Sequence, residues 1–128
     1  MKDIQNRFTT KVKLTIRSDG EGFFGPGIAE LLERTEECGS VKEACRMMEL
    51  SYTKGRRIIR RAEEKLGFPL IEIRHGGSGG GASCLTEQGR NYTQNYRRLE
   101  AEAAEYAAKL FQEAGRLLPE QKNRDADE

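Results

Sequence analysis

The sequence has no long apolar run, few cysteines and a single histidine, and each shortage excludes a class of protein. No stretch approaches the roughly 18 consecutive apolar residues that a membrane-spanning helix needs, and the N-terminus lacks the apolar segment of a secretory signal. The three cysteines, Cys38, Cys45 and Cys84, are odd in number and far apart, a pattern typical of reduced thiols rather than of a disulfide framework or a zinc site. We therefore expect a cytoplasmic protein that does not enter a membrane.

The sequence also offers little for catalysis. It contains one histidine, no metal-ligand spacing, and no nucleophile at a readable distance from a base. The glycine-rich run at 75–82 lacks the lysine of a nucleotide-binding P-loop, and a strand instead of a helix is expected after it, which argues against a dinucleotide-binding motif. We expect no enzyme, no catalytic residue, no metal and no cofactor.

Charge is distributed unevenly along the chain. The 128 residues, enough for one domain and an appendage, carry a net charge of only +1. Residues 40–90 nevertheless carry +4, while residues 99–128 carry −4. Five basic residues lie close together in the sequence, with no acidic residue between them: Lys54, Arg56, Arg57, Arg60 and Arg61. Because a single basic face is enough to bind phosphate, this local excess points to a nucleic-acid partner.

Periodicity and capping residues predict three helices after an N-terminal strand. Alternating residues at 12–17 indicate the strand, and 18–22 read as a turn. Pro26 opens a first helix that Gly39 ends. Ser40 and Glu43 have capping-box spacing, so a short second helix should begin there. Ser51 is a typical N-cap for a third helix that runs to about residue 66.

The third helix has one apolar and one basic side. Gly55, Ile59, Ala62 and Leu66 share a face, and placing this face inward turns the basic cluster outward. Two short helices joined by a tight turn, with an outward basic helix, form a helix-turn-helix pattern.

A hairpin and a long helix are expected next. Strands at 70–74 and 83–85 flank the glycine-rich loop, and Thr86 caps a helix in which apolar residues repeat at spacings of four and three, as in a coiled coil. This helix would extend on the order of 40 Å, more than a small domain can cover, so we expect it to pair with a second copy. The expected dimerisation residues are Tyr92, Tyr96, Leu99, Ala103, Tyr106 and Leu110.

The predicted fold is mainly α with a small β-hairpin wing: a winged helix-turn-helix followed by a long dimerisation helix. The expected domains are a flexible arm at 1–11, the DNA-binding domain at 12–86, the dimerisation helix at 87–118 and a disordered acidic tail at 119–128.

Three motifs resemble one known family. They are Gly25-Pro26-Gly27 with Leu31-Leu32 and the Gly39-Ser40 junction, Ser51-Tyr52 at the start of the third helix, and the segment 74–82 leading into Leu85-Thr86-x-x-Gly89. Together, over roughly residues 12–115, the chain resembles the N-terminal DNA-binding domain of the bacterial molybdate-responsive (ModE-type) transcription regulators, which are related to LysR-type helix-turn-helix domains.

The resemblance implies a regulator that binds DNA, and the sequence departs from it in two ways. Full-length family members continue into paired small β-domains that bind molybdate, and no residue here matches that site. Arg56 stands where the family typically has a tryptophan, so the target sequence is expected to differ.

The sequence therefore predicts a homodimer that binds a roughly palindromic double-stranded DNA operator and regulates transcription, in response to an effector that the residues do not identify. We expect base-edge contacts from Thr53, Lys54 and Arg57, and phosphate contacts from Arg56, Arg60 and Arg61. The remaining expected DNA-binding residues lie at helix starts and on the wing: Ser40, Ser51, Tyr52, Arg74, His75, Gly77, Ser78 and Gly79.

Three alternatives stay open. The winged helix could be a protein-interaction module whose basic face binds no specific DNA. The chain could instead be an oxyanion-responsive regulator without the family's separate ligand domain. Cys84, beside the wing, could sense redox state, which requires an accessible, electropositive thiol.

Overall fold

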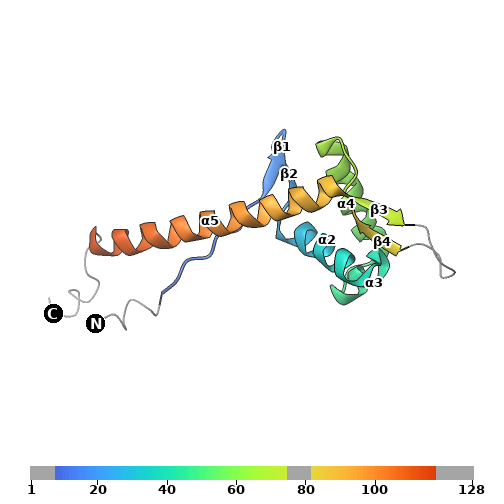
Figure 1. Ribbon diagram of the computed structural model, residues 1–128. Coiled ribbons are helices and arrows are strands. Elements are labelled where there is room, and N and C mark those ends of the chain that lie inside the picture. Colours follow the sequence, from blue (N-terminus) through green and yellow to red (C-terminus); the bar gives the residue numbers. More distant parts are fainter. Residues whose placement is uncertain (1–7, 75–81, 118–128) are drawn as a thin grey trace. The chain divides into compact units, whose positions relative to one another are not determined.

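The computed structural model describes residues 8–74 and 82–117. Its elements follow the order β1 (Ile16–Ser18), β2 (Glu21–Phe24), α2 (Pro26–Cys38), α3 (Val41–Met47), α4 (Tyr52–Leu66), β3 (Ile71–Arg74), β4 (Ala82–Leu85) and α5 (Glu87–Leu117) (Figure 1). Lys13–Glu100 form one compact unit, and the rest of α5, from Ala101, belongs to a second. The expected fold class, mainly α with a small hairpin and a long C-terminal helix, is confirmed.

The caps of the three short helices are those that the sequence predicts. Pro26 occupies the first turn of α2, and Gly39 ends this helix in the left-handed conformation, with φ of 76°. The Ser40 side chain accepts a hydrogen bond from the Glu43 amide at 3.0 Å. The Ser51 side chain accepts one from the Lys54 amide at 3.1 Å. Each serine thus satisfies an amide that the first turn of its helix leaves free.

A tight turn joins α3 to α4. Glu49 adopts the left-handed conformation there, with φ of 55°, and the Leu50 amide donates to the Cys45 carbonyl at 2.9 Å. The helices approach closely because Gly55 has no side chain: a Cβ at this position would lie 2.3 Å from the Cys45 sulfur. The glycine therefore sets the separation between α3 and α4.

Two antiparallel hairpins form separate sheets (Figure 1). In one, β3 pairs with β4 from Ile71↔Leu85 to Arg74↔Ala82, as predicted. The other was only half predicted: the expected strand at 12–17 is reduced to β1, and β2 lies partly where a turn was expected. Asp19 and Gly20, both with positive φ, make the two-residue turn between these strands, the type that an Asp-Gly pair favours.

The core draws on nearly every element of the Lys13–Glu100 unit. Phe24, Leu31, Leu32, Ile59 and Leu70 are fully or almost fully buried. Two aromatic rings from the start of α5 complete this core. Because they pack inside their own chain, α5 is anchored to the domain by its first turns.

Those two rings belong to Tyr92 and Tyr96, which were expected to face a second copy but pack against their own chain. The Tyr96 ring is 2% exposed and its hydroxyl donates to the Leu14 carbonyl at 2.8 Å. Both rings meet Phe24 edge-on, with centroids 4.9 Å and 5.1 Å away. These contacts bury Tyr96 and partly bury Tyr92 within one chain, so Tyr96 is not available to a second copy.

The last helix, α5, begins as the sequence indicates. The Thr86 side chain accepts a hydrogen bond from the Gly89 amide at 2.8 Å, and the helix then continues for 31 residues. None of the helices in the described part of the chain combines the length and the apolar composition that crossing a membrane requires.

Candidate nucleic-acid interface

The basic side chains of α4 lie on its solvent side. Gly55, Ile59 and Ala62 are buried, and their spacing of four and three residues places them on one face of the helix. The opposite side is consequently basic. Lys54, Arg57, Arg60 and Arg61 are exposed, and Arg56 is half-buried.

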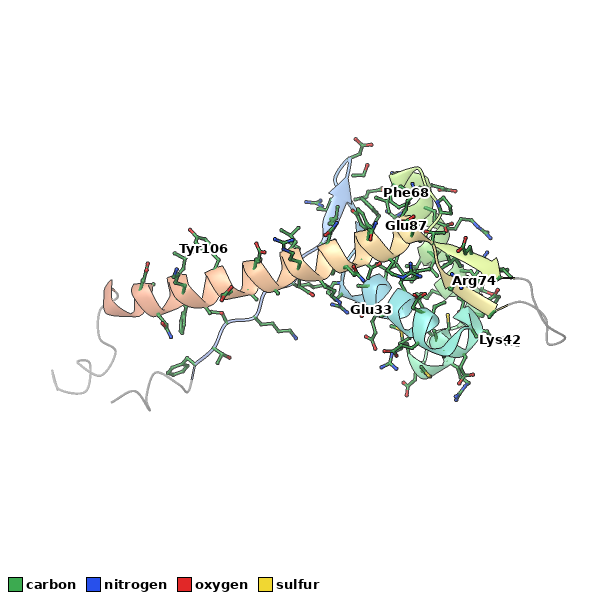
Figure 2. The ribbon with its side chains drawn as sticks, in the orientation of Figure 1. Glu33, Lys42, Phe68, Arg74, Glu87 and Tyr106 are labelled. Atoms are coloured by element: carbon green, nitrogen blue, oxygen red, sulfur yellow. The ribbon has the colours of Figure 1, made fainter. Side chains whose placement is uncertain are left out.

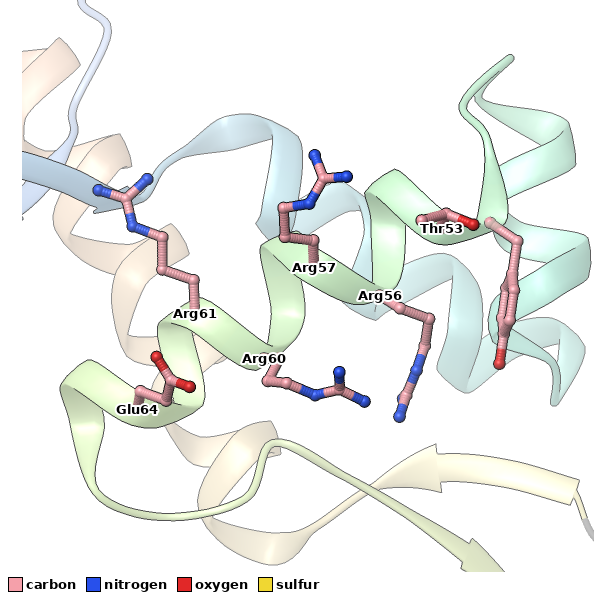
Figure 3. A pocket seen from close by; sticks show the side chains of 7 residues that line it. Thr53, Arg56, Arg57, Arg60, Arg61 and Glu64 are labelled. Carbon is pink, nitrogen blue, oxygen red and sulfur yellow. The ribbon is translucent and has the colours of Figure 1, made fainter.

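These side chains border a shallow groove along α4, which Figure 3 shows from close by. The residues that line it are Tyr52, Thr53, Arg56, Arg57, Arg60, Arg61 and Glu64. Arg57 and Arg61 extend from one edge of the helix, and Arg56 and Arg60 from the other. Four guanidinium groups therefore flank one continuous helix surface, which Glu64 ends with a negative charge.

Most of these charges have no ion-pair partner in the described part of the chain. Arg61 donates to the Glu21 carboxylate on β2 at 3.0 Å, and both side chains stay about half exposed. Lys54, Arg56, Arg57 and Arg60 form no ion pair with any residue in 8–74 or 82–117. The positive charge of this face is thus available to an external anion.

A second groove joins the start of α4 to the β3–β4 hairpin. Ser40, Tyr52 and Arg56 line it together with Ile73 and Ser83. Sequence reasoning named the first three separately, and the fold brings them together. The Ser40 and Ser51 hydroxyl oxygens each accept one helix-capping hydrogen bond, which leaves each hydroxyl its donor hydrogen and one lone pair for another partner.

The wing is described at its base only. Arg74 is exposed at the end of β3 (Figure 2), and Ile73 beside it is 58% exposed. The other wing predictions, His75, Gly77, Ser78 and Gly79, fall outside the described residues. Arg74 therefore adds one cation on the hairpin side of the α4 surface.

Sequence reasoning missed three charged residues near this surface. Lys42, on α3, lines the groove toward the hairpin. Lys13 borders another groove beside α4, and the Glu21 carboxylate accepts a hydrogen bond from Arg61. The Asp19-Gly20 pair was the available signal for the last two, since it predicts the hairpin that brings this part of the chain back against the domain.

Two ion-pair networks hold the surrounding elements. The Glu36 carboxylate on α2 accepts from the Leu85 amide at 2.7 Å and from the Arg90 guanidinium, and these bonds lower the pKa of Glu36. Arg97 on α5 binds Glu33 and Glu100, each at 2.9 Å. The hydrogen bond that Arg97 donates to the Glu33 carboxylate is the main cause that raises the pKa of Arg97. These contacts fasten β4 and α5 to α2.

The cysteines occupy different environments. Cys45 is buried against α4, and burial raises the pKa of its thiol. Cys38 is exposed and Cys84 is half-buried, and all three are unpaired. Within the described ranges, no three histidine, cysteine, aspartate or glutamate side chains come together as a metal site.

Beyond Tyr96, the apolar stripe of α5 is open to solvent. Leu99 is 51% exposed, Tyr106 63% and Leu110 45%, and Figure 2 shows Tyr106 on the helix. Ala103, between them, is half-buried. Among the described residues, the helix face that packs into the core at its start is therefore only partly covered further along.

Comparison with known proteins identifies one similar regulator. No family model matches the chain. The transcriptional regulator ModE of Haemophilus influenzae is 29% identical to it over 104 residues, which amount to 81% of this chain and 40% of that protein. The chain thus spans well under half of the length of this relative. The similarity is to a transcriptional regulator and not to an enzyme.

Proposed function

We propose that the chain is a sequence-specific, double-stranded DNA-binding transcription regulator that acts as a homodimer. The observation that carries this proposal is the exposed face of α4, where Lys54, Arg56, Arg57 and Arg60 have no ion-pair partner among the described residues. An outward basic helix in the third position of a helix-turn-helix fits the major groove of a duplex. The similarity to a transcriptional regulator supports the same role.

Within this proposal, different residues have different tasks. Thr53, Lys54 and Arg57 lie near the N-terminus of α4, where recognition helices meet base edges. Arg56, Arg60 and Arg61 bind phosphates, which adds affinity without sequence information. Arg74 extends the contact to the backbone beside the wing. Two copies paired through α5 would place two α4 helices about 34 Å apart on a palindromic site.

The test measures how binding depends on salt. Duplexes selected from random DNA would supply the operator, and fluorescence polarisation would give the affinity at several salt concentrations. Replacing Arg56 and Arg60 together by Gln should lower the slope of log affinity against log salt by about two, since each phosphate contact contributes roughly 0.9. Lys109→Gln, a charge removed from α5, is the control and should leave the slope unchanged.

Two outcomes would contradict the proposal. One is an absence of enriched sequences combined with binding that does not respond to salt. The other is an equal slope for the wild type and the Arg56/Arg60 variant. Either result would favour a protein-interaction module, for which the exposed stripe of Leu99, Tyr106 and Leu110 would be the contact surface.

A further inference from the structure

A third groove borders α4 on the side of the β1–β2 hairpin. It is formed by three segments that are distant in sequence. Lys13 lies on one wall, before β1, and Gly25–Gly27 contribute the start of α2. Lys54, Arg57 and Arg61 on α4 form the other wall. Arg57 and Arg61 also line the groove along α4, so the two grooves share these two side chains.

The chemistry of this groove is that of an anion site. Four cationic side chains from two segments line it, and the nearby Glu21 is already bound to Arg61 at 3.0 Å. The N-terminus of α2 adds to the positive potential, because Gly25 provides no side-chain cap and the first turn contains no acidic residue. The groove is also open at Gly27, where an added Cβ would meet nothing within 4 Å.

We propose that this groove binds phosphates of the DNA backbone, so that a duplex whose major groove holds α4 is also held beside the β1–β2 hairpin. The inference rests on the proposed function and extends it to residues that sequence reasoning left out. The cations of this groove continue along α4. A row of cations fits a polyanion better than a single small anion, and a DNA backbone strand at the edge of a major groove presents such a row of phosphates. Lys13 and the start of α2 thereby contact the duplex on the side of α4 away from the β3–β4 hairpin.

The sharpest test adds a negative charge without disturbing the fold. Gly27→Glu places a carboxylate in the groove, and Gly27→Gln adds a side chain of the same size without charge. Both residues favour helix over glycine, and a carboxylate in a first helical turn is stabilising, so neither variant should melt below the wild type. We expect Gly27→Glu to bind DNA at least about tenfold more weakly than Gly27→Gln at low salt, because like charges repel.

A second variant removes a cation. Lys13→Gln should lower the salt slope by about one, the value for one lost phosphate contact, while Lys109→Gln leaves it unchanged. Equal affinities for the two Gly27 variants, with an unchanged slope for Lys13→Gln, would overturn the inference while the wild type still bound DNA. If the wild type itself failed to bind DNA in a salt-dependent way, the proposed function would fail and the inference with it.

Discussion

The basic face of α4 owes its position to Gly55, a residue without a side chain. An ideal Cβ at this position would lie 2.3 Å from the Cys45 sulfur and about van der Waals distance from Leu31 and Leu50. Cys45 is 1% exposed and Leu31 equally buried, so the sulfur has little room to move aside. The position of α4, and with it the direction of the basic face, follows from this contact.

We expect Gly55→Ala to destabilise the domain by about 1–3 kcal/mol, the usual effect of overpacking a core. The change would otherwise be stabilising by about 1 kcal/mol, because alanine favours helix over glycine. Urea unfolding would measure the difference, and Cys45→Ala combined with Gly55→Ala should recover most of it by removing the sulfur. A single Gly55→Ala variant as stable as the wild type would contradict the close contact.

Other residues could be predicted because their role is local. The caps Ser40 and Ser51 were found from spacing alone, since each serine bonds an amide three residues ahead. The approach of Gly55 to Cys45 could not be found in this way. It depends on the angle between two helices, which the spacing within either helix does not determine.

At the scale of elements, Glu36 connects α2 to both β4 and α5. Its carboxylate accepts hydrogen bonds from the Leu85 amide and the Arg90 guanidinium. The bond from Leu85 is the largest of the causes that lower the pKa of Glu36 below its ordinary value. The hairpin that carries the wing is therefore attached to the helix-turn-helix partly through an ionised carboxylate.

This contact should make stability depend on pH. Because the folded-state pKa of Glu36 is lowered, its contribution is present above the unfolded-state value of about 4.3 and is lost as pH falls through the folded-state pKa. We expect Glu36→Gln to be less stable than the wild type at pH 7, with a difference that shrinks toward pH 3. Urea unfolding at several pH values would measure it, with the exposed neighbour Glu37→Gln as control. A difference that stayed constant with pH would contradict the role of the charge.

The β1–β2 hairpin explains where element prediction failed. The sequence of β2, Glu-Gly-Phe-Phe, does not alternate between apolar and polar residues, and a glycine within it lowers strand propensity. Phe24 is nevertheless fully buried, so packing against the domain, and not local pattern, maintains this strand. The third groove was not predicted either, because β2 contributes to its lining and local pattern does not indicate this strand.

At the scale of the whole molecule, the sequence shows local excesses of charge but not which distant charges the fold brings together. The net charge of +1 conceals a face of α4 whose cations lie together. Helical spacing predicted this face because its buried side, Gly55, Ile59 and Ala62, is set by the core. Spacing could not predict that Lys13 and Lys54 line one groove, since only the tertiary fold brings these distant positions together. The domain boundaries at 86 and 118 stay a prediction.

The apolar stripe of α5 carries the proposal of a homodimer. Helical geometry places Leu99, Ala103, Tyr106 and Leu110 on the same face as Tyr92 and Tyr96. Tyr96 is buried and Tyr92 half-buried, both against Phe24, whereas Leu99, Tyr106 and Leu110 are 51%, 63% and 45% exposed. A row of exposed apolar side chains at spacings of three and four is typical of a helix that pairs with another helix.

We expect Leu99→Asp to convert the proposed dimer into a monomer, because a carboxylate buried between apolar helices would lose its hydration without gaining a partner. The fold should persist, since Leu99 is 51% exposed within the chain. Ala108→Asp is the matched control: Ala108 is exposed and lies on the opposite face of α5, so this variant should stay dimeric. Sedimentation equilibrium at micromolar concentration would give the masses. A dimeric Leu99→Asp protein, or a monomeric wild type, would show that the exposed stripe does not pair two copies, and a palindromic operator would then lose its structural basis.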